Sequence, residues 1–135
     1  INQLSDGYKS TISLVADIAY RMAALNPQLL GNVCRETDGV VLIDEVDLHL
    51  HPTWQQRILG DLTEIFPKVQ FIVSTHAPAV INTVKSENII LLDDGMAYET
   101  SWKRYKYYYK WYYAFIRTTN GNKGTISKIL SFYRL

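Results

Sequence analysis

Residues 39–52 read GVVLIDEVDLHLHP, and this stretch decides the fold. Four apolar residues, Val40 to Ile43, follow one another without polar alternation and end at two acids, Asp44 and Glu45. A continuous apolar run is typical of a central parallel strand buried on both faces, whereas a strand with one face in water alternates. The stretch therefore predicts a buried parallel strand that delivers two adjacent carboxylates at its carboxyl end.

The residues around this strand alternate between helical and strand patterns. Apolar positions recur at helical spacing before it and after it, and a second unbroken apolar run follows the second helix. The predicted order is a helix (9–26), an irregular connection (29–39), the strand already described, a helix (51–67), a strand (68–76), a short helix (77–84) and a hairpin (87–99). This alternation predicts an α/β fold with a mostly parallel sheet flanked by helices.

Polar side chains follow both predicted strands, at the edge where open α/β sheets bind ligands. Asp44 and Glu45 would point to different sides of the strand, which allows two roles. Asp44 would hold Mg²⁺ through its water shell, and Glu45 would orient or deprotonate the water that attacks a γ-phosphate. His76 ends the second strand and could bind that phosphate. The alternatives stay open: a solvated acid pair at a strand end, and a structural histidine.

The first residues, INQLSDGYKST (1–11), do not form a phosphate-binding loop of the form G-x-x-x-x-G-K-[ST]. Tyr8 separates Gly7 from Lys9, and Asn2 stands where the first glycine would be. Two interpretations remain, a helix N-terminus that binds an anion or an ordinary helix cap.

Four motifs follow one another along the chain: LSDG (4–7), VVLIDE (40–45), VDLHLHP (46–52) and STHAP (74–78). In this order they resemble the signature motif, the Walker B strand, the D-loop and the switch-histidine motif of an ABC-type ATPase head. The resemblance covers residues 1–100 and is to the C-terminal part of such a head. The branch it points to includes RecF-, SMC- and OLD-like ATPases and the AAA family ATPases found beside retrons and Septu systems.

The resemblance implies a P-loop NTPase fold of the ABC type, of which this chain would form the C-terminal lobe. It implies a homodimer of two heads around ATP and Mg²⁺. Ser5 and Gly7 would contact the γ-phosphate of the nucleotide held by the partner head, and Asp47 would cross the dimer interface. The implied function is ATP hydrolysis in DNA repair or phage defence, beside a nuclease or another effector.

On the same resemblance, Glu45 and His76 are the catalytic residues and Asp44 is the metal ligand. A Walker A loop with its lysine would lie upstream of the signature motif, where this sequence has none, so we expect these residues alone to bind ATP weakly. The alternative is a catalytically inactive fragment that serves as an interaction or nucleic-acid-binding module. His49 and His51 fit structural residues better than a zinc pair, since no cysteine lies nearby in the sequence.

The net charge of +1 conceals two parts of opposite charge. Residues 1–100 carry all 13 acidic residues and 6 of the 14 Lys and Arg, which gives −7; residues 101–135 carry the other 8 and no acid, which gives +8. We therefore expect a boundary near Thr100, with a partial ATPase domain before it and a basic, Tyr-rich tail after it. Two interpretations of the tail stay open: a surface that binds single-stranded nucleic acid, or a non-native, out-of-frame segment.

The composition also bears on the compartment. Cys34 is the only cysteine, so an internal disulfide is excluded and a reducing cytosol is compatible. We find no secretory signal pattern and no apolar run near the roughly 18 residues of a membrane-spanning helix. We expect a soluble, cytoplasmic protein with no membrane partner.

Overall fold

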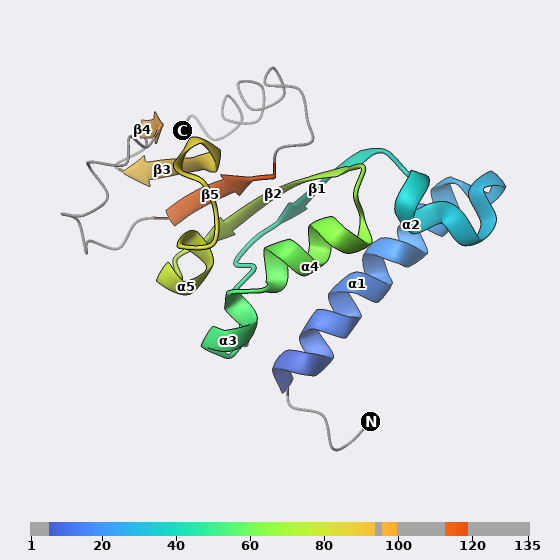
Figure 1. Ribbon diagram of the computed structural model, residues 1–135, viewed down its shortest axis with the longest axis horizontal. Coiled ribbons are helices and arrows are strands. Elements are labelled where there is room, and N and C mark those ends of the chain that lie inside the picture. The colour runs from blue at the N-terminus through green and yellow to red at the C-terminus, as the bar shows by residue number, and fades with distance from the viewer. Residues whose placement is uncertain (1–5, 94–95, 100–112, 119–135) are drawn as a thin grey trace.

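The computed structural model describes residues 6–93, 96–99 and 113–118 of the chain. Its helices and strands alternate as an α/β protein (Figure 1). Their order is α1 (Asp6–Leu25), η1 (Pro27–Asn32), α2 (Val33–Glu36), β1 (Gly39–Ile43), α3 (Pro52–Gln55), α4 (Ile58–Ile65), β2 (Val69–Thr75), α5 (Pro78–Ile81), η2 (Ser86–Asn88), β3 (Ile89–Asp93), β4 (Met96–Glu99) and β5 (Tyr113–Arg117).

The helices follow the predicted pattern with one difference. α1 ends at Leu25, directly before Asn26, as expected because a residue that precedes proline disfavours helical angles. The helix predicted over 51–67 forms as two helices, α3 and α4, which residues 56 and 57 separate. His51 caps α3, since its Nδ1 accepts the Thr53 amide N–H at 3.4 Å, and this confirms the structural role predicted for it.

The sheet has the strand order β1-β2-β5-β3-β4. β1 and β2 are parallel, with Gly39 opposite Val69 and Ile43 opposite Val73, whereas the other three pairings are antiparallel. The α/β class is confirmed, but the expected mostly parallel sheet is wrong for the described strands. β1, β2 and β3 do run in the same direction, but β5 stands between β2 and β3 in the opposite direction and makes two of the three antiparallel pairings.

β5 comes from the C-terminal side of the compositional boundary predicted at Thr100. The sheet therefore takes strands from both sides of that boundary. β3 and β4 form the predicted hairpin, in which Asp93 pairs with Met96. Residues 100–112 and 119–135, on which both interpretations of the tail depend, lie outside the described residues, so the two-part division stays a prediction.

β1 differs from the strand that the sequence predicted. It stands at the edge of the described sheet, and Val40 and Leu42 are 43% and 57% exposed. Val41 and Ile43, on the other face, pack against the hydrophobic core. The expected burial on both faces is wrong because the helices of the described chain cover only one face of this strand.

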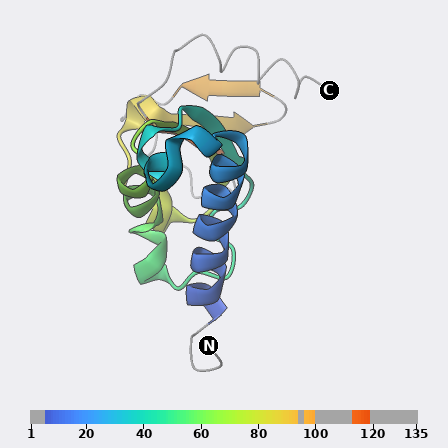
Figure 2. The ribbon, with the colours of Figure 1, turned by 90° about the vertical axis from the view of Figure 1, so that its right-hand side faces the viewer.

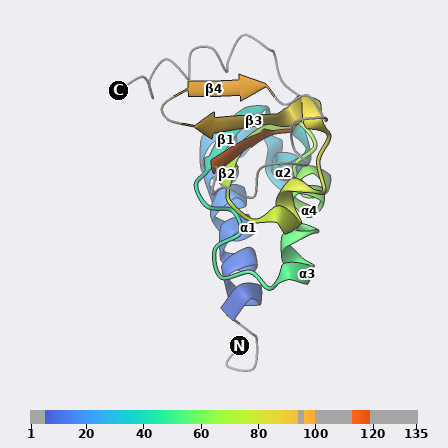
Figure 3. The same cartoon turned by 90° about the vertical axis from the view of Figure 1, so that its left-hand side faces the viewer.

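The core lies between the sheet and the helices. Figure 1 shows α1 and α4 on the same side of the sheet, and in both side views the hairpin of β3 and β4 lies at the opposite end of the molecule from the start of α1 (Figure 2, Figure 3). The largest fully buried side chains are those of Phe66, Phe71, Leu62, Ile116, Val69, Val73, Val80 and Thr75. None of the helices in the described ranges has the length and hydropathy to cross a bilayer.

We expect two leucines to differ sharply in their contribution to stability. Leu62 is fully buried, so Leu62→Ala should lower the free energy of unfolding by about 2–5 kcal/mol. Leu42 lies on the uncovered face of β1, so Leu42→Ala should change it by about 0.5 kcal/mol or less. Urea unfolding of both variants measures the difference. Equal losses would mean that the outer face of β1 is covered in solution.

Candidate functional site

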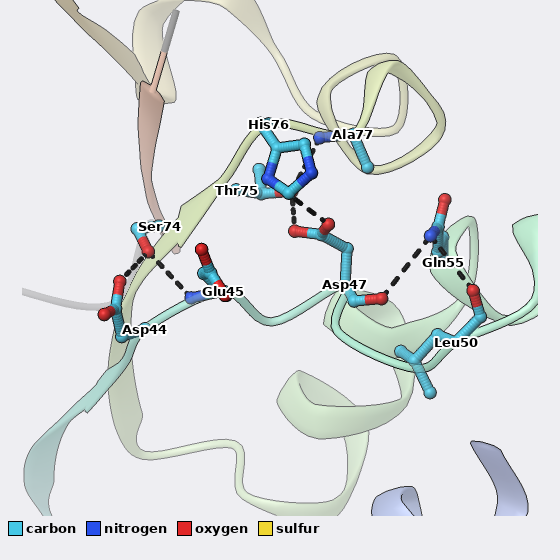
Figure 4. A network of polar contacts seen from close by, with 9 residues as sticks. All are labelled: Asp44, Glu45, Asp47, Leu50, Gln55, Ser74, Thr75, His76 and Ala77. Atoms are coloured by element: carbon cyan, nitrogen blue, oxygen red, sulfur yellow. Dashed lines mark hydrogen bonds and ion pairs between the residues drawn. The ribbon is translucent and has the colours of Figure 1, made fainter. Parts of the chain in front are cut away.

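The predicted site residues meet at one edge of the sheet. β1 and β2 are parallel and in register up to Ile43 and Val73, so the residues that follow both strands emerge side by side. Asp44 and Glu45 follow β1, and His76 follows β2 (Figure 4). The structure thus brings the acid pair and the imidazole to the same edge, as the sequence predicted. Their chemical roles stay predictions.

Ser74 binds both members of the acid pair. Its hydroxyl donates to Asp44 Oδ1, and its Oγ accepts the Glu45 amide N–H at 2.8 Å. Ser74 is only 2% exposed, whereas Asp44 is exposed. One buried hydroxyl therefore fixes the direction of the Asp44 carboxylate and the backbone of Glu45 together.

The loop from Glu45 to Leu50 contains unusual backbone angles. Glu45 has φ 50° and His49 has φ 62°, both in the left-handed region that side chains other than glycine rarely adopt. Such angles cost of order 1–3 kcal/mol each and persist where the surrounding structure fixes them. Gln55 is one such support, because its Nε2 donates to the Leu50 carbonyl at 3.0 Å.

Asp47 is the buried acid of the site. Its side chain is 5% exposed; Oδ1 accepts the Thr75 hydroxyl, and Oδ2 lies 3.7 Å from Nδ1 of His76. The expectation that Asp47 also crosses a dimer interface stays a prediction. The carboxylate faces inward, where the Thr75 hydroxyl donates a hydrogen bond to it and so offsets part of the cost of its burial.

Gly7 lies against the same loop. A Cβ at this position would stand 3.0 Å from the His49 carbonyl oxygen, which is tighter than an ordinary contact, so a side chain at residue 7 would require the loop or the start of α1 to shift. Next to it, the ring of Tyr8 packs edge-to-face on Trp54 at 5.0 Å between centroids, which makes Trp54 a partly buried contact of α1. Ser5 lies outside the described residues. The contact of Ser5 and Gly7 with a nucleotide in a partner head stays a prediction.

Three residues of the site were missed by the sequence analysis: Ser74, Thr75 and Gln55. The Ser-Thr pair directly after the apolar run FIV was the available signal for the first two, since consecutive residues of a strand face opposite sides and can each bind one acid. Gln55 gave no signal, because its partners are carbonyls of a loop whose path the sequence did not predict.

The residue types partly fit a magnesium ion. The network in Figure 4 has three carboxylates and one imidazole, so it favours a cation. Mg²⁺ prefers oxygen ligands and is usually bound by one or two carboxylates together with water and substrate phosphates. Asp44 supplies one such carboxylate, and no group of three or more metal-ligating side chains occurs among the described residues. The described residues could therefore supply only part of the coordination of such an ion.

Comparison with known proteins identifies the class to which this fold and site belong. Residues 1–82 match the family described as AAA domain, putative AbiEii toxin, Type IV TA system, and the chain belongs to this family.

Similar relatives include the retron Ec83 probable ATPase of Escherichia coli, which is 48% identical over 97 residues, 72% of this chain and 18% of that protein. The retron Vc95 probable ATPase of Vibrio cholerae serotype O1 biovar El Tor is 51% identical over 94 residues, 70% of this chain and 18% of the relative. The Septu protein PtuA of Bacillus thuringiensis is 37% identical over 93 residues, 66% of this chain and 22% of the relative. The chain thus spans about a fifth of the length of these proteins. The resemblance to AAA ATPases of retrons and Septu systems is confirmed.

Ser74→Ala tests the role of the shared hydroxyl. The variant leaves the Glu45 amide without its partner, so we expect the free energy of unfolding to fall by about 1–3 kcal/mol and the Glu45 amide hydrogen to exchange faster. Thr63→Ala is the control, since that hydroxyl donates to carbonyls within α4 and lies away from the site. Chemical denaturation and amide hydrogen exchange measure both effects. Unchanged exchange at Glu45 in Ser74→Ala would contradict this role.

Proposed function

We propose that the chain is the C-terminal lobe of an ABC-type ATPase head that hydrolyses ATP with Mg²⁺. The observation that carries this proposal is the shared edge of β1 and β2, where Asp44, Glu45 and His76 stand together. The printed names of the two retron relatives, both probable ATPases, support it.

Each of the three side chains has a role that its position favours. Asp44 is exposed and its carboxylate is oriented by Ser74, so it would hold the metal ion through water. Glu45 would accept the proton of the attacking water, and His76 would bind at the terminal phosphate through a hydrogen bond. When bound, Mg²⁺ would neutralise charge on the phosphate oxygens.

The other groups that bind the phosphates would come from outside this chain. We propose that a Walker A lobe completes the nucleotide site and that a second head closes it, with Ser5 and Gly7 contacting the partner's nucleotide. The retron and Septu names favour a role in antiviral defence over DNA repair. A nuclease or another effector as partner, and binding of nucleic acid, also remain part of this proposal.

A chimera tests the proposal. Residues 6–93 would replace the matching stretch of the Escherichia coli relative, which supplies the upstream lobe, and ATP hydrolysis would be measured with and without Mg²⁺. We expect Mg²⁺-dependent hydrolysis, and Glu45→Gln should lower kcat by about 10²-fold or more, because positioned general bases contribute about 10²–10⁴-fold.

Glu64→Gln is the matched control, because this glutamate lies exposed on α4 and its loss should leave the rate unchanged. A chimera that folds but does not hydrolyse ATP would favour the inactive interaction module. Equal activity of the chimera and its Glu45→Gln variant would remove Glu45 as the base.

A further inference from the structure

Asp47 has no part in the hydrolysis step described above, yet it is a buried carboxylate beside the proposed phosphate-binding histidine. We propose that Asp47 is a positioning residue that holds His76 with Nδ1 turned inward and protonated, so that Nε2 is the nitrogen directed to the phosphate. The part of this inference that concerns phosphate rests on the proposed function. The part that concerns the ring of His76 rests only on the contacts of Asp47.

The hydrogen bonds of Thr75 fix which oxygen of Asp47 faces His76. Thr75 is fully buried, and its Oγ1 accepts the Ala77 amide N–H at 3.1 Å. A hydroxyl has one proton to donate, and here that proton goes to Asp47 Oδ1. Oδ1 is thereby committed to Thr75, and Oδ2 is the oxygen that remains on the side of His76.

His76 turns Nδ1 toward that oxygen. Nδ1 lies 3.7 Å from Oδ2, while the imidazole is 46% exposed and the carboxylate 5% exposed (Figure 4). The protonation of a histidine nitrogen is set by the hydrogen-bond partner that the ring meets, and a carboxylate at Nδ1 favours the proton on that nitrogen. The separation exceeds a hydrogen bond, but contacts of catalytic groups often shorten when the ligand binds.

The consequence for the site is a defined orientation of the ring. Nε2 lies across the imidazole from Nδ1, so it is directed away from Asp47. In the neutral ring with its proton on Nδ1, Nε2 carries a lone pair, so it can accept a hydrogen bond from a water or a protonated oxygen at the phosphate. Asp47 would then act on the phosphate only through His76, as the buried aspartate of a catalytic triad acts through its histidine.

Asp47→Asn should reverse the protonation of the neutral ring. In this variant the Thr75 hydroxyl still needs an acceptor, so the amide oxygen of the new side chain takes the Oδ1 position and its NH₂ group takes the position of Oδ2. An N–H donor then faces Nδ1 of His76, which favours a lone pair there and the proton on Nε2. The substitution exchanges one carboxylate oxygen for an NH₂ group and keeps the shape of the side chain.

Nitrogen-15 NMR of histidine-labelled protein tests this without nucleotide, at a pH where the rings are neutral. In the wild-type chain we expect His76 to be mainly Nδ1–H, and in Asp47→Asn mainly Nε2–H. Asp44→Asn is the control, because Asp44 stands at the same edge but is bound to Ser74, and it should leave the wild-type form unchanged. A wild-type ring that is mainly Nε2–H overturns the inference, even where a variant fails to fold.

The chimera adds a kinetic test of whether Asp47 acts through His76. If Asp47 acts through His76, Asp47→Asn should lower kcat/KM in the parent chimera but cause no further loss when His76→Ala is already present. Independent, additive losses would overturn the coupling. A chimera without ATPase activity would count against the proposed function alone, because the NMR result does not depend on hydrolysis.

Discussion

The site depends on two neighbouring hydroxyls at the end of β2. Ser74 and Thr75 are consecutive, so they face opposite sides of the strand, and each binds a different acid of the loop that follows β1. Ser74 holds Asp44 and Thr75 holds Asp47. Together with the Val46 amide, which donates to the Ser74 carbonyl at 3.0 Å, they tie the loop to the strand at three points. The loop keeps two residues in the left-handed region because these bonds fix its path.

The elements of the fold could be predicted because they depend on local patterns. Apolar spacing placed α1 and its end at Leu25, and the Asp-Gly pair placed the hairpin of β3 and β4. Two features depend instead on which strands meet, and local patterns do not encode that. β1 is apolar on both faces yet stands at an edge, and β5 enters the sheet from a segment whose composition gave no strand pattern.

The site could be predicted only where a residue's position in a strand fixes its place. Asp44, Glu45 and His76 end adjacent parallel strands, so their common edge follows from the order of elements. Asp47 lies three residues into a loop, and its burial depends on a hydroxyl 28 residues away. A carboxylate in a polar loop is normally expected in water, so the sequence did not predict this burial.

If the site binds a nucleotide as proposed, its charges require a second, cationic half. Its network contains three carboxylates, and the only side chain in it that can carry a positive charge is His76 (Figure 4). A triphosphate would be repelled by such a site unless cations stood between them, and one imidazole cannot balance both. Mg²⁺ would supply part of that charge, and the remainder would come from groups outside the network, as in P-loop proteins that use a lysine and a nest of backbone amides. A chain that spans about a fifth of its relatives leaves room in the longer proteins for that second, cationic half.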